Sequence, residues 1–257
     1  MRKVLVILSL ALVSGCAVNQ GTALAAEFDE VWAGTPDVSE VRTSGDNPLP
    51  FSGSAVGELV VADGTGADRV TQLAGELRRY VADNDHVTGR ITAGGITVTV
   101  VAEEERNTES LGLWLSLTTD DRVSEGDLAE TTSGRRIMVT AAGPEAVLDV
   151  FRDMVADGGR HEPLTRVRSL TVMTGPRATP YLSLQTDHEG RVPEPALAAY
   201  EAVRAEYEVV RASVRADRTA GSLVSIVVSP DADLAAATEL ARSAAPGLGA
   251  ALKVTGS

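Results

Sequence analysis

The sequence predicts an α+β protein in which two to three strand–helix–strand units, ferredoxin-like or split βαβ, form one or more sheets with helices on one face. One observation is a pattern of strand, turn, amphipathic helix and strand that occurs three times after residue 54. The other is composition. Apolar residues make up 44% of the 257 residues but aromatic residues only 4%, so a sizeable core must be mainly aliphatic. A single continuous sheet fits this pattern nearly as well.

The first unit begins with a strand over 58–62. A helix over 67–82 follows, because apolar residues recur there at the helical period on one face. The closing strand covers 96–101, where Ile96, Val98 and Val100 alternate with threonines. Before the first unit, residues 28–32 predict a short helical turn, and the density of Gly and Pro over 33–53 predicts loop or extended chain.

The second and third units repeat the order. The second has a strand over 136–140, a helix opened by Gly143-Pro144, and a closing strand over 167–173. In the third, a strand over 223–228 precedes a helix over 233–245, which Ser229-Pro230-Asp231 caps, and 252–255 closes the unit.

Two further strands and one further helix complete the prediction. The strands are 111–117, with four leucines on one face and Trp114 on the other, and 181–185. The helix covers 195–216, where apolar residues that include Tyr200 and Tyr207 recur at spacings of four and three, a heptad seam. An exposed Trp114 or an unpaired seam would suit a binding surface, whereas burial against the chain's own core is the plainer interpretation of both.

The N-terminus carries an export signal. Met1-Arg2-Lys3 precedes an apolar run from Val4 to Val13, which is too short for a membrane span of about 20 residues. Val13-Ser14-Gly15-Cys16 then resembles the lipobox of the bacterial lipoproteins. The resemblance implies removal of residues 1–15, a diacylglyceryl (palmitate-type) lipid on Cys16, and a place on the outer face of the cytoplasmic membrane.

A lone cysteine agrees with lipidation. Cys16 is the only cysteine, so no disulfide can form within the chain, and a single exported thiol needs an explanation. Ordinary secretion with cleavage after Ala23-Leu24-Ala25 is the alternative. The predicted organisation is a signal peptide at 1–15, lipidated Cys16 with a tether and a Pro/Gly-rich loop at 16–53, and α+β regions at 54–176 and 177–257, the second of which holds the heptad helix.

Charge excludes one class of function. The formal net charge is −13, so the acidic protein lacks the basic surface of a nucleic-acid binder. Its acidic body also repels anionic headgroups, so the lipid would hold it at the membrane.

No catalytic, metal or cofactor site is predicted. His86, His161 and His188 are the only histidines, and no helical His-x-x-x-His pair exists. Gly64-Thr65-Gly66 lies between a strand and a helix, but Arg69 occupies the third glycine position of a dinucleotide-binding loop.

The predicted function is therefore a membrane-anchored cell-envelope lipoprotein acting as a non-catalytic binding or assembly module, with an envelope protein as a candidate partner. Its candidate binding residues are Trp114, Tyr200 and Tyr207. One alternative is a small-ligand-binding lipoprotein. A second is an envelope hydrolase built on His161 or His188.

Overall fold

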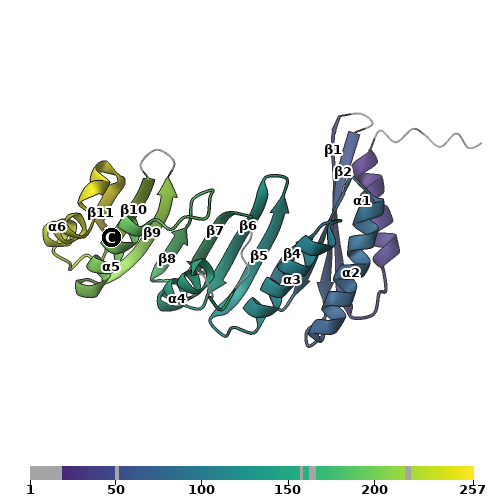
Figure 1. The fold of residues 1–257 in the computed structure, drawn as a ribbon, viewed down its shortest axis with the longest axis horizontal. Coiled ribbons are helices and arrows are strands. Elements are labelled where there is room, and N and C mark those ends of the chain that lie inside the picture. The colour runs from purple at the N-terminus through teal and green to yellow at the C-terminus, as the bar shows by residue number, and fades with distance from the viewer. Residues whose placement is uncertain (1–18, 50–51, 157–158, 162–165, 218–220) are drawn as a thin grey trace, which may run out of the picture.

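A computed structural model describes residues 19–49, 52–156, 159–161, 166–217 and 221–257. These residues form one eleven-stranded sheet in which the strands follow one another in chain order (Figure 1). Antiparallel and parallel pairs alternate along it: β1–β2 is antiparallel, β2–β3 parallel and β3–β4 antiparallel, and the alternation continues to the parallel pair β10–β11. The repeating unit is therefore a hairpin followed by a helix.

The elements have the following bounds. The strands are β1 Val38–Leu49, β2 Ser52–Val61, β3 Val87–Ala93, β4 Ile96–Val100, β5 Val123–Thr131, β6 Gly134–Ala141, β7 Val167–Thr174, β8 Tyr181–Gln185, β9 Val209–Asp217, β10 Gly221–Val228 and β11 Leu252–Gly256. The helices are α1 Gln20–Trp32, α2 Ala67–Asp83, α3 Glu104–Thr118, α4 Pro144–Val155, α5 Glu194–Glu206 and α6 Leu234–Ala244, with a 3-10 helix over Pro246–Ala251.

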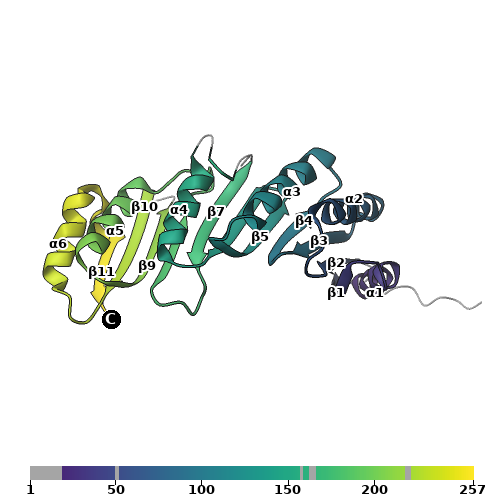
Figure 2. The same ribbon diagram turned by 90° about the horizontal axis from the view of Figure 1, so that it is seen from below.

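All the described helices lie on one face of the sheet, as Figure 2 shows. Each helix from α2 to α6 connects two adjacent parallel strands. Each new strand is added at the same edge of the sheet, and the described helices all lie on one face. Because successive parallel pairs point in opposite directions, the strand–helix–strand crossovers alternate in handedness. Each unit contacts chiefly its neighbours, which is the construction of a repeat protein.

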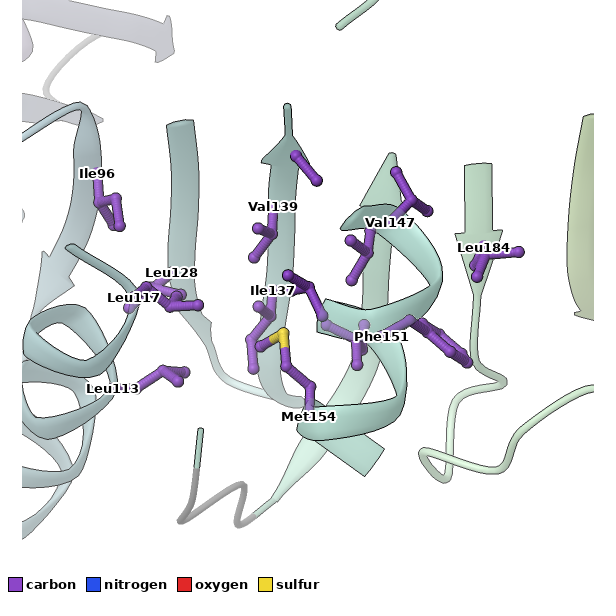
Figure 3. Packing of buried hydrophobic residues seen from close by; sticks show 14 of the residues in the cluster. Ile96, Leu113, Leu117, Leu128, Ile137, Val139, Val147, Phe151, Met154 and Leu184 are labelled. Atoms are coloured by element: carbon purple, nitrogen blue, oxygen red, sulfur yellow. The ribbon is translucent and has the colours of Figure 1, made fainter. Parts of the chain in front are cut away.

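The core lies between the helices and the sheet. In its central part, Leu113 and Leu117 of α3 point toward the sheet at Leu128, and Phe151 of α4 points toward the side of Leu184 (Figure 3). Each of these five side chains is almost completely buried. The helix-facing strand positions are mainly Val, Ile, Leu and Ala, so the core is aliphatic.

Glycines let α1 approach the first hairpin closely. A Cβ on Gly21 would lie 2.2 Å from the carbonyl oxygen of Asp46, and one on Gly57 would lie 2.3 Å from the Phe28 ring. Phe28 in turn contacts Tyr80 of α2 edge-on, with ring centroids 5.4 Å apart. α1 therefore covers the helix side of β1 and β2 next to α2.

The ferredoxin-like fold class is wrong. Such units require helices that cross over to non-adjacent positions, whereas here every strand pairs with its predecessor in the chain and one sheet results. The prediction failed because β3 and β5 were not recognised as strands, so hairpin–helix repeats were interpreted as strand–helix–strand units. Antiparallel pairing of β7 with β8 carries the sheet across residue 176.

The strand predicted over 111–117 is also wrong, because this segment belongs to α3. Leu113, Trp114 and Leu117 are buried at helical spacing, while Leu115 is 44% exposed. The alternating leucines match period two by coincidence. Glu104 and Glu105 in the first turn favour a helix through its dipole.

Two more predictions need correction. The helix expected over 195–216 ends at Glu206, and the rest of that segment forms β9, where Val209 and Val210 favour extended chain. Residues 33–53 contain β1 despite their glycines and prolines. The predicted helices over 67–82 and 233–245 correspond to α2 and α6, and the predicted strands over 181–185 and 252–255 to β8 and β11.

Candidate functional site

The sheet face opposite the helices is a candidate binding surface, called here the open face. It consists of the strand side chains that alternate with the buried ones, and no described helix packs on it. Its members are mostly Ser, Thr and charged residues: threonines dominate β3 and β4, and serines occur on β7 to β10. A flat polar face of this kind is free to contact a large partner.

The proximal half of the open face, β1 to β5, pairs its cations with carboxylates. Arg42 donates to Glu40 at 2.7 Å and lies 3.7 Å from Glu58 on the neighbouring strand. Arg90 of β3 lies 3.3 Å from Asp127 of β5. Opposite charges therefore compensate one another across this half.

The distal half, β6 to β11, carries cations without such partners. These cations are Arg136, Arg211, Arg215 and Lys253, called here the distal cation patch. All four are exposed, and among the side chains that the structure describes, none forms an ion pair and no carboxylate points from these strands onto this face. A chain of net charge −13 thus carries an excess of positive charge, among the described side chains, on the distal half of this face.

Strand register fixes the spacing of the patch. Arg211 and Arg215 point from the same strand four residues apart, which separates their Cα atoms by about 13 Å. Ser213 between them pairs with Ser225, which pairs with Lys253, so Lys253 lies about 10 Å across from their midpoint. Arg211 also lies over the Tyr181 ring, 4.7 Å from its centroid, which orients its guanidinium.

A hollow of about 300 Å³ adjoins the distal half where β7, β8 and β9 lie side by side. Its lining includes Arg168, Gln185, Asp187 and His188. Asp187 is held by Arg191, whose Nε donates to it at 2.7 Å. Hydrogen bonds from Arg191 lower the pKa of Asp187 despite its burial, so this carboxylate stays charged at neutral pH.

The predicted binding residues lie elsewhere. Trp114 is buried under α3, where its Nε1 donates to the carbonyl oxygen of Ala93 at 3.0 Å. Tyr200 is buried on α5, and Tyr207 is half-buried just after that helix. The three therefore belong to the packing between helices and sheet and do not form one surface. Cys16 lies outside the described residues.

The structure brings together one cluster that sequence reasoning did not assemble. Nε2 of His161 lies 2.9 Å from Oδ2 of Asp120, and its Nδ1 lies 2.8 Å from Oγ of Ser116. Arg122 donates to the same carboxylate at 2.7 Å. That guanidinium holds the pKa of Asp120 well below its ordinary value, while burial lowers the pKa of His161.

The three side chains are arranged in the order of a Ser–His–Asp catalytic relay, but their burial and contacts indicate a role in stabilising the fold. A neutral ring with its proton on Nε2 donates to Asp120 and accepts from Ser116. However, Oγ of Ser116 also lies 2.9 Å from the carbonyl oxygen of Arg160, and the ring of His161 is fully buried. The contacts join the segment after α4 to the end of α3.

The other histidines and the glycine-rich turn show no comparable assembly. His86 is exposed, and His188 lies 3.7 Å from Glu189 at the surface. Within the described ranges, no three His, Cys, Asp or Glu residues converge as metal ligands. Gly64-Thr65-Gly66 forms the turn into α2, with Gly64 at a φ of 81°. No described helix is long and apolar enough to cross a membrane.

Sequence signals for the distal cation patch existed. Arg211, Ser213 and Arg215 alternate with Ala212 and Val214, a period of two that indicates a half-buried strand. The helix predicted over 195–216 depended on the heptad spacing of its apolar residues, and the alternation of the arginines with apolar residues was not weighed against it. Lys253 is the only lysine after residue 3 and lies on a separate strand, so only the sheet brings it near the arginines.

Comparisons with known proteins place the chain in no family. No family model matches it, and no curated protein matches it. A solved structure of a Clostridium difficile protein, described as of the phenazine-biosynthesis PhzC/PhzF type, is 7% identical. It aligns over 71% of this chain and 88% of its own with a TM-score of 0.17, which carries no inference about fold or function.

Proposed function

We propose that the chain is a membrane-anchored lipoprotein of the bacterial cell envelope that acts as a non-catalytic binding or assembly module through its open face. The lipobox at Val13 to Cys16 supports the anchor and a place on the outer face of the cytoplasmic membrane. The observation that carries the binding role is the open face itself. It is a polar sheet surface without a described helix over it, and its distal cations form no ion pair with a carboxylate among the described side chains.

The short N-terminal connection supports a defined orientation. Helix α1 begins at Gln20, so three residues separate it from Cys16, a reach of at most about 14 Å. Helix α1 covers β1 and β2 at one end of the sheet, and β11 lies at the other end, about 50 Å away (Figure 1). A lipid on Cys16 would hold the proximal end near the bilayer and leave the distal half free to reach outward.

Site-specific photo-cross-linking in intact cells tests the binding role. A photoreactive amino acid replaces Ser213 on the open face or, as the matched control, Glu239 on the outer side of α6. We expect adducts, with protein or with glycan, from position 213 and few from position 239. Equal labelling at both positions, or none at 213, would contradict a binding role for the open face.

Membrane fractionation tests the anchor separately. We expect the wild-type chain in the membrane fraction, released by detergent, and the Cys16→Ser variant to lose acylation and its stable membrane association. A variant that stays membrane-bound would contradict lipidation as the anchor.

A small-ligand-binding lipoprotein is the second candidate, and the 300 Å³ hollow lined by Arg168 and His188 favours it. Its volume lies at the lower limit of known ligand pockets. A small anion or sugar that raises the melting temperature with dose, and fails to do so with Arg168→Gln, would support this role.

A further inference from the structure

We propose that the distal cation patch binds an anionic glycan, a polysaccharide of the cell envelope that carries carboxylate or phosphate groups. The inference rests on the proposed binding role of the open face and names the chemistry of its partner. Its physical basis is electrostatic complementarity between an extended polyanion and cations that have no carboxylate partner among the described side chains of an otherwise acidic protein.

The contrast between the two halves of the open face is the first argument. On the proximal half, Arg42 and Arg90 each have a carboxylate within 3.7 Å, so their charge is compensated inside the protein. On the distal half, Arg211, Arg215 and Lys253 have no such carboxylate among the described side chains. An external anion is the missing counter-charge.

The spacing of the cations indicates a polymer. Arg211, Arg215 and Lys253 form a triangle with sides of about 12 to 13 Å between Cα atoms. Arg136 lies three strands from Arg215, about 16 Å away. Such separations exceed what one small anion can bridge, whereas charges repeated along a chain can meet several cations in turn.

The side chains between the cations suit a glycan. Ser183, Ser213 and Ser225 occupy one row across three neighbouring strands, and Gln185 lies in the next row. Hydroxyl and amide groups both donate and accept hydrogen bonds, as sugar hydroxyl groups do.

A protein partner fits this surface less well. The core of a protein interface is typically rich in aromatic and aliphatic residues. On the distal half of the open face, apolar side chains such as Met138, Leu223 and Val227 are interspersed with arginines and with Ser and Thr, so they form no continuous apolar core. The aromatic side chain described there is Tyr181, and Arg211 lies over its ring.

A lipid surface also fits less well than a glycan. Arg211, Arg215 and Lys253 lie toward the end of the sheet opposite α1 (Figure 1), so a lipid on Cys16 near α1 would leave them away from the bilayer.

The experiment measures binding of the full-length acylated protein, purified in detergent, to polygalacturonate and to phosphorylated dextran. Unmodified dextran of matched length is the neutral control. The test variant is Arg211→Gln/Arg215→Gln/Lys253→Gln. The matched variant, Arg79→Gln/Arg152→Gln/Arg242→Gln, removes the same number of charges at exposed positions on helices, away from the open face. Circular dichroism and thermal unfolding verify that both variants are folded.

We expect the wild type to bind at least one charged glycan and not neutral dextran. We expect the patch variant to lose at least about tenfold in affinity and the matched variant less than about threefold. Raising salt from about 50 to 200 mM should weaken wild-type binding, as counterion release requires for a polyanion.

Three outcomes would overturn the inference: no binding to either charged glycan, an equal loss in both variants, or equally tight patch-dependent binding to phosphatidylglycerol vesicles, which would assign the patch to lipid. The two proposals can fail separately. If position 213 still gives cross-links in cells but no charged glycan binds, the binding role of the open face stands and the glycan inference fails. If position 213 gives no cross-links and no charged glycan binds, both the binding role of the open face and the glycan inference are contradicted.

Discussion

Nε2 of His161 lies 2.9 Å from Oδ2 of Asp120, and neither side chain is exposed to solvent. The pair connects the end of α3 to the segment that follows α4, and Arg122 extends it to Asp153 of α4 with a contact of 2.6 Å. Two adjacent repeats are therefore joined by a buried polar network as well as by apolar packing. Such a network adds a pH-dependent contribution to stability.

His161 should make the stability depend on pH below neutrality. Burial lowers its pKa below the ordinary 6.5, so the folded protein binds this proton less readily than the unfolded chain. Stability is therefore present above pH 6.5 and decreases as the pH falls below it. We expect urea unfolding of the wild type to give a falling free energy between pH 7 and pH 5, and His161→Gln to flatten that slope. His188→Gln, at an exposed position, should keep the wild-type slope; a flattened slope in this control would refute the assignment.

The two tryptophans should respond differently to the same substitution. Nε1 of Trp114 donates to Ala93, whereas Nε1 of Trp32 is buried without a hydrogen-bond partner among the described residues. Trp114→Phe should cost about 0.5 to 1.5 kcal/mol because it removes the hydrogen bond from Nε1 to the carbonyl oxygen of Ala93. Trp32→Phe removes an unsatisfied donor and should cost less. Chemical denaturation of both variants checks this order, and a larger loss for Trp32→Phe would contradict it.

Glu130 should be essential for stability. It lies between two arginines, 2.5 Å from Arg106 and 2.6 Å from Arg135, and the side chain of Arg135 is only 2% exposed. Although burial opposes it, hydrogen bonds from the two arginines lower the pKa of Glu130, so it is ionised at neutral pH. Glu130→Gln leaves a buried guanidinium with Glu109 as its remaining carboxylate at 3.3 Å. We expect a loss of about 3 kcal/mol.

The matched control for this pair is Glu40→Gln. Glu40 forms an exposed ion pair with Arg42, and such pairs contribute about 0 to 1 kcal/mol. Equal losses in free energy of unfolding for the two variants would show that burial of the Glu130 pair has no energetic consequence.

Two glycine substitutions should have opposite signs. A Cβ on Gly57 would lie 2.3 Å from the Phe28 ring, so Gly57→Ala should displace α1 and cost about 1 to 3 kcal/mol. A Cβ on Gly75 of α2 would meet nothing within 4 Å, so Gly75→Ala should stabilise the helix by about 0.5 to 1 kcal/mol. Thermal unfolding measures both, and a destabilised Gly75→Ala variant would contradict this view of α2.

The amino-acid sequence by itself determined the local features of this protein. The periodicity of α2 and the alternation of β8 arise from neighbouring residues, and both were predicted. The cap of α6 is also local, but it is Asp233 and not the predicted Ser229-Pro230-Asp231. The export signal and lipobox are likewise linear patterns, and lipidation of Cys16 stays a prediction. Where two periods competed, as over 111–117 and 207–214, the wrong one was chosen, because side-chain burial distinguishes them and burial depends on the tertiary fold.

Only the tertiary structure decided which surface and which side chains come together. Lys253 lies two strands from Arg211 and Arg215 on the same face, and His161 contacts Asp120, across separations in sequence that no local pattern encodes. The open face exists because every helix crosses on the same side of a sheet that always grows in one direction. Pairing of adjacent strands and burial of one sheet face depend on contacts along the whole chain. They therefore determined the candidate site, whereas the local sequence determined the individual strands and helices.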